Sequence, residues 1–192
     1  MMKNKLCFAT NNAHKLEEIQ AILGDNFELL SLKDIQCNEE LPETGNTLEA
    51  NSLQKAKYLY DNYQVNCFAD DTGLEVHALG GEPGVDSAHY AGKQRSHGDN
   101  VNLLLKNLAD KPARSARFRT VITLIQNGNI TQFEGIVNGQ IIETLRGTEG
   151  FGYDPIFIPE GYDRTFAEMN ILEKGEISHR GRAFQKLVEF LK

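Results

Sequence analysis

One segment restricts the possible folds more than any other, because it joins two long strand-like stretches by a tight turn. Ser115 to Gln126 alternates apolar and polar side chains, which is the pattern of a half-buried strand. The dipeptide Asn127-Gly128 favours a two-residue β-hairpin turn, and Ile130 to Val137 is the predicted partner strand. Asn138-Gly139 predicts a second tight turn before a further strand at Gln140 to Thr144. Such an antiparallel ribbon excludes a purely parallel sheet.

The other apolar patterns predict strands that alternate with helices, so the expected fold class is α/β with a mixed sheet. Short apolar runs at Leu6 to Ala9 and at Phe27 to Leu32 predict strands, and a helical pattern that ends at Gly24 lies between them. Thr47 to Tyr60 predicts a longer helix, with Thr47 as its N-cap. Two further helices are predicted nearer the C-terminus, one at His97 to Ala109 and one that begins after Ser178 as its N-cap.

Composition and charge limit the classes of function. The chain has 192 residues without repeats or linkers, so we expect residues 1–192 to form a single domain. The net charge of −7 and the absence of tryptophan argue against binding to duplex or single-stranded nucleic acid. We expect no membrane span and no signal peptide. The three cysteines form no C-x-x-C motif and are odd in number, which is typical of reduced thiols in a cytoplasmic protein.

The segment from Cys67 to Gly92 contains the first candidate site. Val65 to Ala69 predicts a buried strand, and the adjacent carboxylates Asp70 and Asp71 follow it. Thr72-Gly73 then predicts a turn, which places both carboxylates just past a strand end. Carboxylates at such a position commonly hold a hard cation, because α/β sheets open their clefts at the carboxyl ends of strands. A solvated turn without a ligand is the alternative for these residues.

A second polar turn, Thr10-Asn11-Asn12, lies between the first predicted strand and the first predicted helix. Backbone N–H groups at the start of a helix favour anions. Lys15 falls in the first helical turn, where the helix dipole disfavours a cation, so a phosphate contact would explain its position. A capped helix with a solvated lysine is the alternative.

Gly147 to Pro159 forms a third polar cluster, in which glycines flank Phe151 and in which Tyr153 and Asp154 follow. Glycine beside an aromatic ring suits a planar base stacked on that ring. A glycine-rich turn with a core phenylalanine is the alternative.

The fourth cluster lies at the start of the last predicted helix. His179 and Arg180 occupy its first turn, and Lys174 is near in sequence. Cations at a helix N-terminus oppose the dipole, which favours an anionic or carbonyl-bearing ligand. Together the four clusters supply phosphate contacts, carboxylates for a metal and a stacking ring. Hydrolysis of a nucleoside triphosphate requires this combination.

These clusters lie in motifs that resemble those of the inosine triphosphate pyrophosphatase family. The four motifs span nearly the whole chain in the family's order and read FATNNAHK, ADDTGLEVHALGGEPGVDSAHYAG, GFGYDPIF and SHRGRAF. The resemblance implies Mg²⁺-dependent hydrolysis of ITP, dITP and XTP to the monophosphate and pyrophosphate, which cleanses the nucleotide pool. It also implies an elongated mixed sheet flanked by helices, two lobes with the active cleft between them, and a homodimer.

Carried over by position, the resemblance assigns roles to individual residues. Asp71 is the expected catalytic carboxylate and Mg²⁺ ligand, and Asp70 is a further candidate ligand. Thr72 is expected to contact the substrate, and Phe151 to stack on the purine. The turn before the first helix is expected to hold the phosphates, and the C-terminal clusters to complete the base pocket. The expected contacts in these two regions are Thr10, Asn11, Asn12, Ala13, His14, Lys15, Gly152, Tyr153, Asp154, Lys174, His179 and Arg180.

One departure from the family pattern concerns the metal. The family usually has a glutamate where this chain has Ala50, and Glu49 lies one residue earlier. One residue is about 100° around a helix, so Glu49 replaces the missing carboxylate only if the first turn shifts. Glu49 is therefore a further candidate metal ligand. Two alternatives stay open: a related pyrophosphatase for other modified nucleotides, or, because of the missing glutamate, a nucleotide-binding protein without turnover.

Overall fold

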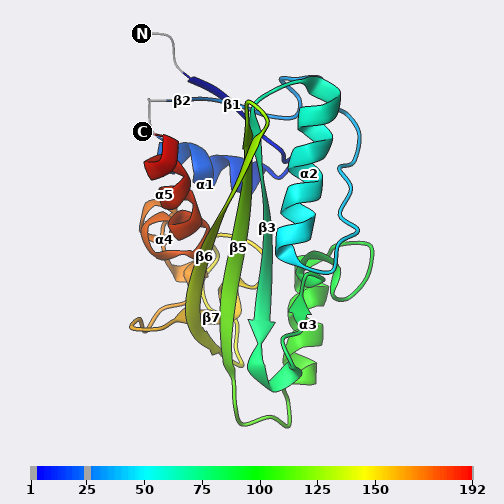
Figure 1. Ribbon diagram of the computed structural model, residues 1–192. Helices are drawn as coiled ribbons and strands as arrows, with labels where there is room; N and C mark the ends of the chain where they lie inside the picture. Colours follow the sequence, from blue (N-terminus) through cyan, green and yellow to red (C-terminus); the bar gives the residue numbers. More distant parts are fainter. Residues whose placement is uncertain (1–3, 24–26, 192) are drawn as a thin grey trace.

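The predicted hairpin forms the centre of the molecule. In the computed structural model, which describes residues 4–23 and 27–191, β5 (Ser115–Gln126) pairs antiparallel with β6 (Asn129–Ile141) along its whole length. Asn127 and Gly128 form the turn, and both have positive φ angles, as the predicted turn requires. The two strands run through the full height of an elongated molecule (Figure 1).

The hairpin belongs to one mixed sheet, as predicted. Among the described residues the strand order is β2-β1-β3-β5-β6-β7, and β4 pairs with β3 outside this order. β1 is parallel to β2 and β3, and the other pairs are antiparallel. The remaining strands are β1 (Asn4–Phe8), β2 (Phe27–Leu30), β3 (Cys67–Val76), β4 (Pro83–Gly84) and β7 (Phe157–Pro159).

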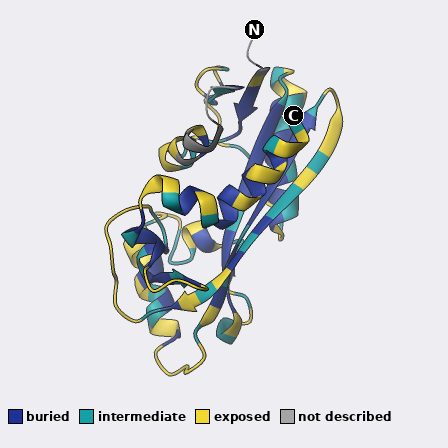
Figure 2. Ribbon diagram, turned by 90° about the vertical axis from the view of Figure 1, so that its left-hand side faces the viewer, coloured by how far each residue is buried: buried dark blue, intermediate teal, exposed yellow. Residues whose placement is uncertain are grey.

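Helices cover both faces of this sheet. α2 packs on β3 and β5 from one side, while α5 packs on β5 and β6 from the other, where α1 and α4 join it (Figure 1). The central strands are mostly buried and the outward sides of the helices are exposed (Figure 2). The α-helices are α1 (Ala13–Leu23), α2 (Leu48–Tyr63), α3 (His97–Asn107), α4 (Ile171–Ile177) and α5 (His179–Leu191). Short 3₁₀ turns occur at His77–Leu79, Ser87–His89, Asp154–Ile156 and Phe166–Glu168.

The predicted helix caps are present. Thr47 accepts a hydrogen bond from the backbone N–H of Ala50, and Ser178 accepts one from the backbone N–H of Gly181. Each cap satisfies a backbone donor that the helix itself leaves unpaired, which contributes about 1 kcal/mol. The caps fix where α2 and α5 begin, and both of these ends lie beside the cleft described below. The predicted helix end at Gly24 lies outside the described residues.

The turn predicted at Thr72-Gly73 is wrong. β3 continues without a break from Cys67 to Val76, because every one of these residues pairs with β5. Gly73 allows the backbone of β4 to approach β3 closely, since a Cβ atom on Gly73 would lie 2.5 Å from the carbonyl oxygen of Gly84. The two carboxylates therefore lie in the middle of a strand and not beyond its end.

The second turn predicted at Asn138-Gly139 is also wrong. β6 runs through both residues to Ile141, because β7 pairs with its last part on the outer edge. A Cβ atom on Gly139 would lie 2.3 Å from the carbonyl oxygen of Ile158, so glycine here makes room for β7. A glycine required for close backbone approach and one required for a turn look the same in a sequence.

Candidate active site

A gap in strand pairing opens a cleft beside β3. β1 pairs with β3 only at Cys67 and Phe68, and β4 pairs with it only at Leu74 and Glu75. The part of β3 between these pairs has no strand partner on this edge among the described residues. A cleft of about 520 Å³ lies there. The carboxylates thus lie past a strand end, as predicted in outline, but the strand that ends is β1.

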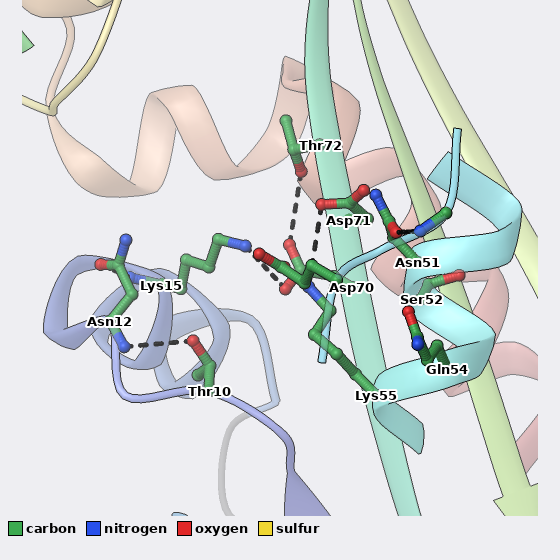
Figure 3. A network of polar contacts seen from close by, with 12 residues as sticks. Thr10, Asn12, Lys15, Asn51, Ser52, Gln54, Lys55, Asp70, Asp71 and Thr72 are labelled. Carbon is green, nitrogen blue, oxygen red and sulfur yellow. Dashed lines mark hydrogen bonds and ion pairs between the residues drawn. The ribbon is translucent and has the colours of Figure 1, made fainter. Parts of the chain in front are cut away.

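Asp70 points to the face of the sheet that carries α1 and α5. Its carboxylate is 2.9 Å from the Lys15 ammonium and accepts a hydrogen bond from the Thr72 hydroxyl (Figure 3). It also lies 3.5 Å from Nε of Arg180. Burial alone would raise the pKa of Asp70, but the two cations outweigh it and hold that pKa well below its usual range. Asp70 is therefore an ionised carboxylate that is already paired.

Asp71 points to the opposite face, toward α2, because successive side chains of a strand alternate. Its carboxylate lies 3.7 Å from the Lys55 ammonium (Figure 3). Lys55 also pairs with Glu43. Burial raises the pKa of Asp71, Lys55 opposes the rise, and Glu43 adds to it. Its Oδ2 is buried and has no hydrogen-bond partner among the described residues. Asp71 is thus the carboxylate with capacity for a cation or a proton.

Lys55 and Glu43 line the cleft, and the sequence interpretation missed both. Lys55 belongs to the predicted helix from Thr47 to Tyr60, and its side chain is only 7% exposed. The signal was present: α2 buries residues at helical spacing, and polar residues occupy part of that apolar stripe. The buried positions are Leu48, Asn51, Ser52, Lys55, Ala56 and Leu59.

The N-terminal turn lies at the other side of the cleft. The hydroxyl of Thr10 accepts a hydrogen bond from the Asn12 backbone N–H, and the Asn12 side chain caps α1 by accepting from the backbone N–H of Lys15. Thr10, Asn11, Asn12 and Lys15 all line the cleft, whereas Ala13 does not. Burial lowers the pKa of Lys15 although Asp70 opposes this, and the neighbouring Lys55 and Arg180 lower it further. An additional anion beside Lys15 would relieve that unfavourable charge.

A ring and a buried ion pair line the cleft farther along. Lys174 lies 2.7 Å from Asp154, both side chains are about 5% exposed or less, and the ammonium lies 5.0 Å from the centre of the Phe151 ring. Asp154 also accepts a hydrogen bond from the backbone N–H of Phe151, which fixes the loop around the ring. His14 does not line the cleft, but it stacks on Phe151 with ring centres 5.4 Å apart.

Tyr153 and Gly152 also line the cleft, but Tyr153 has a structural contact as well. Its hydroxyl donates a hydrogen bond to the carbonyl oxygen of Ser87 across 2.9 Å in the buried interior. This bond ties the loop that carries Phe151 to the segment after β4.

His179 and Arg180 reach the cleft from the first turn of α5. The His179 ring stacks on Phe118 with centres 4.5 Å apart and planes at 13°. Burial, together with the nearby Arg180, lowers the pKa of His179 well below its usual value, so the ring is neutral. Its Nδ1 is buried without a hydrogen-bond partner among the described residues. Arg180 reaches both Asp70 and Thr72.

Glu49 is not brought into the cleft. Its carboxylate lies 2.7 Å from Arg119 of β5, which also binds Glu75 and Glu134. Glu49 therefore ties the first turn of α2 to the central strand β5, and it does not line the cleft. Asp70 does not line the cleft surface either, because Lys15 and Arg180 cover it.

Comparisons with known proteins identify the family. A family model described as Ham1 family matches residues 6–190. A dITP/XTP pyrophosphatase of Christiangramia forsetii is 52% identical over 97% of this chain and 98% of its own, and one of Flavobacterium johnsoniae is 54% identical over 97% of both. The solved structure of the Staphylococcus aureus Ham1 protein is 36% identical and superimposes with a TM-score of 0.88, covering 98% of both chains. These matches confirm the family resemblance and the fold class predicted from the sequence. The chain belongs to the Ham1 family.

Proposed function

We propose that this protein hydrolyses the non-standard purine triphosphates dITP, XTP and ITP to the nucleoside monophosphate and pyrophosphate. One observation carries the proposal: a single cleft contains both a carboxylate–lysine cluster around Asp71 and an aromatic–polar cluster around Phe151. The first suits a triphosphate and the second suits a purine. Two relatives that match this chain along almost their whole length are dITP/XTP pyrophosphatases, which supports the same activity here.

Asp71 is the proposed catalytic base. Its raised pKa suits a group that accepts a proton from the attacking water as the α–β phosphoanhydride bond breaks. The water oxygen bonds to the α-phosphorus, its proton moves to the Asp71 carboxylate, and pyrophosphate leaves with the bridging oxygen. Asp70 is too strongly paired for this role, and it instead orients Lys15 and Arg180.

The donor set fits Mg²⁺. Among the described residues no group of three or more acidic, histidine or cysteine side chains converges, and magnesium usually needs only one or two carboxylates together with water and phosphate oxygens. Asp71, with its unpartnered buried oxygen, would hold the ion, and Glu43 is the nearer second carboxylate because it shares Lys55 with Asp71. When bound, the ion would neutralise phosphate charge and polarise the scissile bond. Glu49 stays a prediction, and its pairing with Arg119 argues against it.

Lys15, Lys55 and the turn Thr10–Asn12 are the proposed phosphate contacts. Burial alone would lower the pKa of Lys55, but Asp71 and Glu43 raise it, so the ammonium stays charged. Charge neutralisation by fixed cations is the main requirement of phosphoryl chemistry.

The proposed base pocket discriminates at the purine 6-position. Hypoxanthine and xanthine present a carbonyl and an N1–H there, whereas adenine presents an amino group and a bare N1. Arg180 supplies donors and Asp154 an acceptor, and neutral His179 has an unused ring nitrogen. A 6-amino base would leave buried polar groups unpaired, at a cost on the order of 1–3 kcal/mol each.

Release of pyrophosphate from ITP, dITP, XTP, GTP, ATP and dTTP, measured with and without Mg²⁺, tests the proposal. We expect fast, metal-dependent release from the first three only. The Asp71→Asn variant is the control for contaminating activity. Release from ATP as fast as from ITP, or no release from any substrate while binding persists, would contradict the proposal.

We further propose one domain with two lobes, a homodimer and a cytoplasmic location. The single continuous sheet supports one domain, because the buried core clusters at both of its ends share its strands. The cytoplasmic location is supported by three buried free thiols, Cys7, Cys37 and Cys67. Within the described part of the chain, no helix has the length and apolar character of a membrane span. The dimer rests on the family resemblance, and sedimentation of the purified protein tests it.

A further inference from the structure

The first turn of α5 lies unusually close to β6, and the contact is made at Gly135. A Cβ atom on Gly135 would lie 1.9 Å from the carbonyl oxygen of His179 and 2.5 Å from the backbone nitrogen of Ala183. Both are backbone atoms, which cannot rotate out of the way. The φ angle of Gly135 is not among the positive ones, so any residue could adopt its backbone conformation. Space, not conformation, requires glycine at this position.

Two hydrogen bonds from α5 to β6, one on each side of Gly135, stabilise this contact. Arg182 donates a hydrogen bond to the carbonyl oxygen of Ile136, and Lys186 donates one to the carbonyl oxygen of Glu134, each at 2.7 Å. These carbonyls flank Gly135 on the edge of β6 that β5 does not use. α5 is therefore pulled onto the strand at the residue that permits the closest approach.

The same helical turn carries two groups of the proposed base pocket. His179 and Arg180 are each 3% exposed or less, and both line the cleft. Their positions depend on the depth at which α5 sits, because Phe118 and Asp70, which they contact, belong to the sheet. A side chain at 135 would move the turn by about 1 Å or more to restore an ordinary contact distance. Displacements of that size disturb substrate positioning strongly.

We propose that Gly135 is a positioning residue for base recognition. By having no side chain, it lets the first turn of α5 rest directly on β6 and sets His179 and Arg180 at the depth at which they distinguish 6-oxo from 6-amino purines. This inference rests on the proposed function. Gly135 itself does not contact the nucleotide base; it acts through α5.

Gly135→Ala tests the inference, with kcat and KM measured for ITP and for ATP. We expect the ratio of kcat/KM for ITP to that for ATP to fall about tenfold or more, mainly through a higher KM for ITP. Turnover of saturating ITP should change much less, because the Asp71 and Lys55 cluster lies on the other face of the sheet.

Gly139→Ala is the matched control. It lies on the same strand and creates a comparable steric conflict, but against the Ile158 carbonyl oxygen of β7. It should lower the thermal midpoint without changing the ITP-to-ATP ratio. Gly98→Ala, where nothing lies within 4 Å, controls for the glycine replacement itself.

Ala183→Ser provides a second test if Gly135→Ala does not fold. It adds one oxygen atom to the same contact from the helix side, since the Ala183 Cβ already lies 3.0 Å from the position of a Cβ on Gly135. The same loss of discrimination is expected. In a folded variant, an unchanged ratio of kcat/KM for ITP to that for ATP would overturn the inference, including the case in which both values fall equally. Absence of ITP turnover in the unmodified protein would instead overturn the proposed function.

Discussion

Asp70 and Asp71 are neighbours in the chain, but their side chains lie on opposite faces of β3 and meet different cations. Asp70 pairs with Lys15 and Arg180 on the side of α1 and α5, and Asp71 lies near Lys55 on the side of α2. The alternation of a strand thus separates a paired structural carboxylate from one with an unused oxygen. Two identical side chains at adjacent positions therefore differ in their ion pairs and in the direction of their pKa shifts.

Asp71→Asn should remove turnover and leave the fold intact. Asparagine has nearly the same shape, but it cannot accept a proton, so kcat for ITP should fall by roughly 10²-fold or more. Pyrophosphate release measures the loss, and circular dichroism with calorimetric ITP binding checks the fold and the site. Near-normal turnover in this variant would remove Asp71 from the role of base.

Lys55→Met should both destabilise the protein and raise the KM for ITP. The change leaves the buried Asp71 without its neighbouring cation, which costs about 3 kcal/mol. Lys57→Met is the matched control, because Lys57 is exposed two residues along the same helix. Urea denaturation and steady-state kinetics should separate the two variants clearly. If the two lysines behave alike, Lys55 has no part in the site.

Glu43→Gln and Glu49→Gln together decide which glutamate helps to hold the metal. We expect the Mg²⁺ concentration for half-maximal activity to rise at least about tenfold for Glu43→Gln and to change less than about twofold for Glu49→Gln. The reason is that Glu43 shares Lys55 with Asp71, whereas Arg119 holds Glu49 away from the cleft. Binding of Mn²⁺, followed by electron paramagnetic resonance without substrate, gives an independent reading. The reverse order would restore Glu49 as the ligand.

Stability should fall between pH 7 and pH 5 because of His179. Its folded pKa is lowered by burial, so below about pH 6.5 the unfolded chain binds a proton that the folded protein does not. The contribution is fully present above the unfolded pKa and is lost as the pH falls, with a slope approaching about 1.4 kcal/mol per pH unit. Urea midpoints at pH 7.5 and 5.5 measure it. His179→Gln should flatten this dependence, and an equal decline in both proteins would refute the assignment.

Several features of the fold followed from the sequence because they depend on near neighbours. The Asn127-Gly128 turn sets the register of β5 and β6, and Thr47 and Ser178 cap their helices as predicted. These signals act over four residues or fewer, and no distant partner is needed to interpret them. The four polar clusters were equally visible, because their residue types carry the chemistry, and twelve residues predicted to contact the bases or phosphates line one cleft together with Asp71.

What only the tertiary structure decided concerns pairing between distant segments. The sequence could not reveal that pairing with β5 keeps β3 extended through Thr72-Gly73, or that pairing with β7 keeps β6 extended through Asn138-Gly139. It also could not reveal that Lys55 faces Asp71 in the cleft while Glu49 faces Arg119. Each depends on which strand edge is covered and which helix face meets the sheet, and these are non-local facts. By itself the sequence determined the class of fold and the inventory of the site, since both follow from local pattern and residue chemistry. The tertiary structure determined which carboxylate has an oxygen unpaired among the described residues and which lysine lies beside it, because burial and distance exist only in the folded chain.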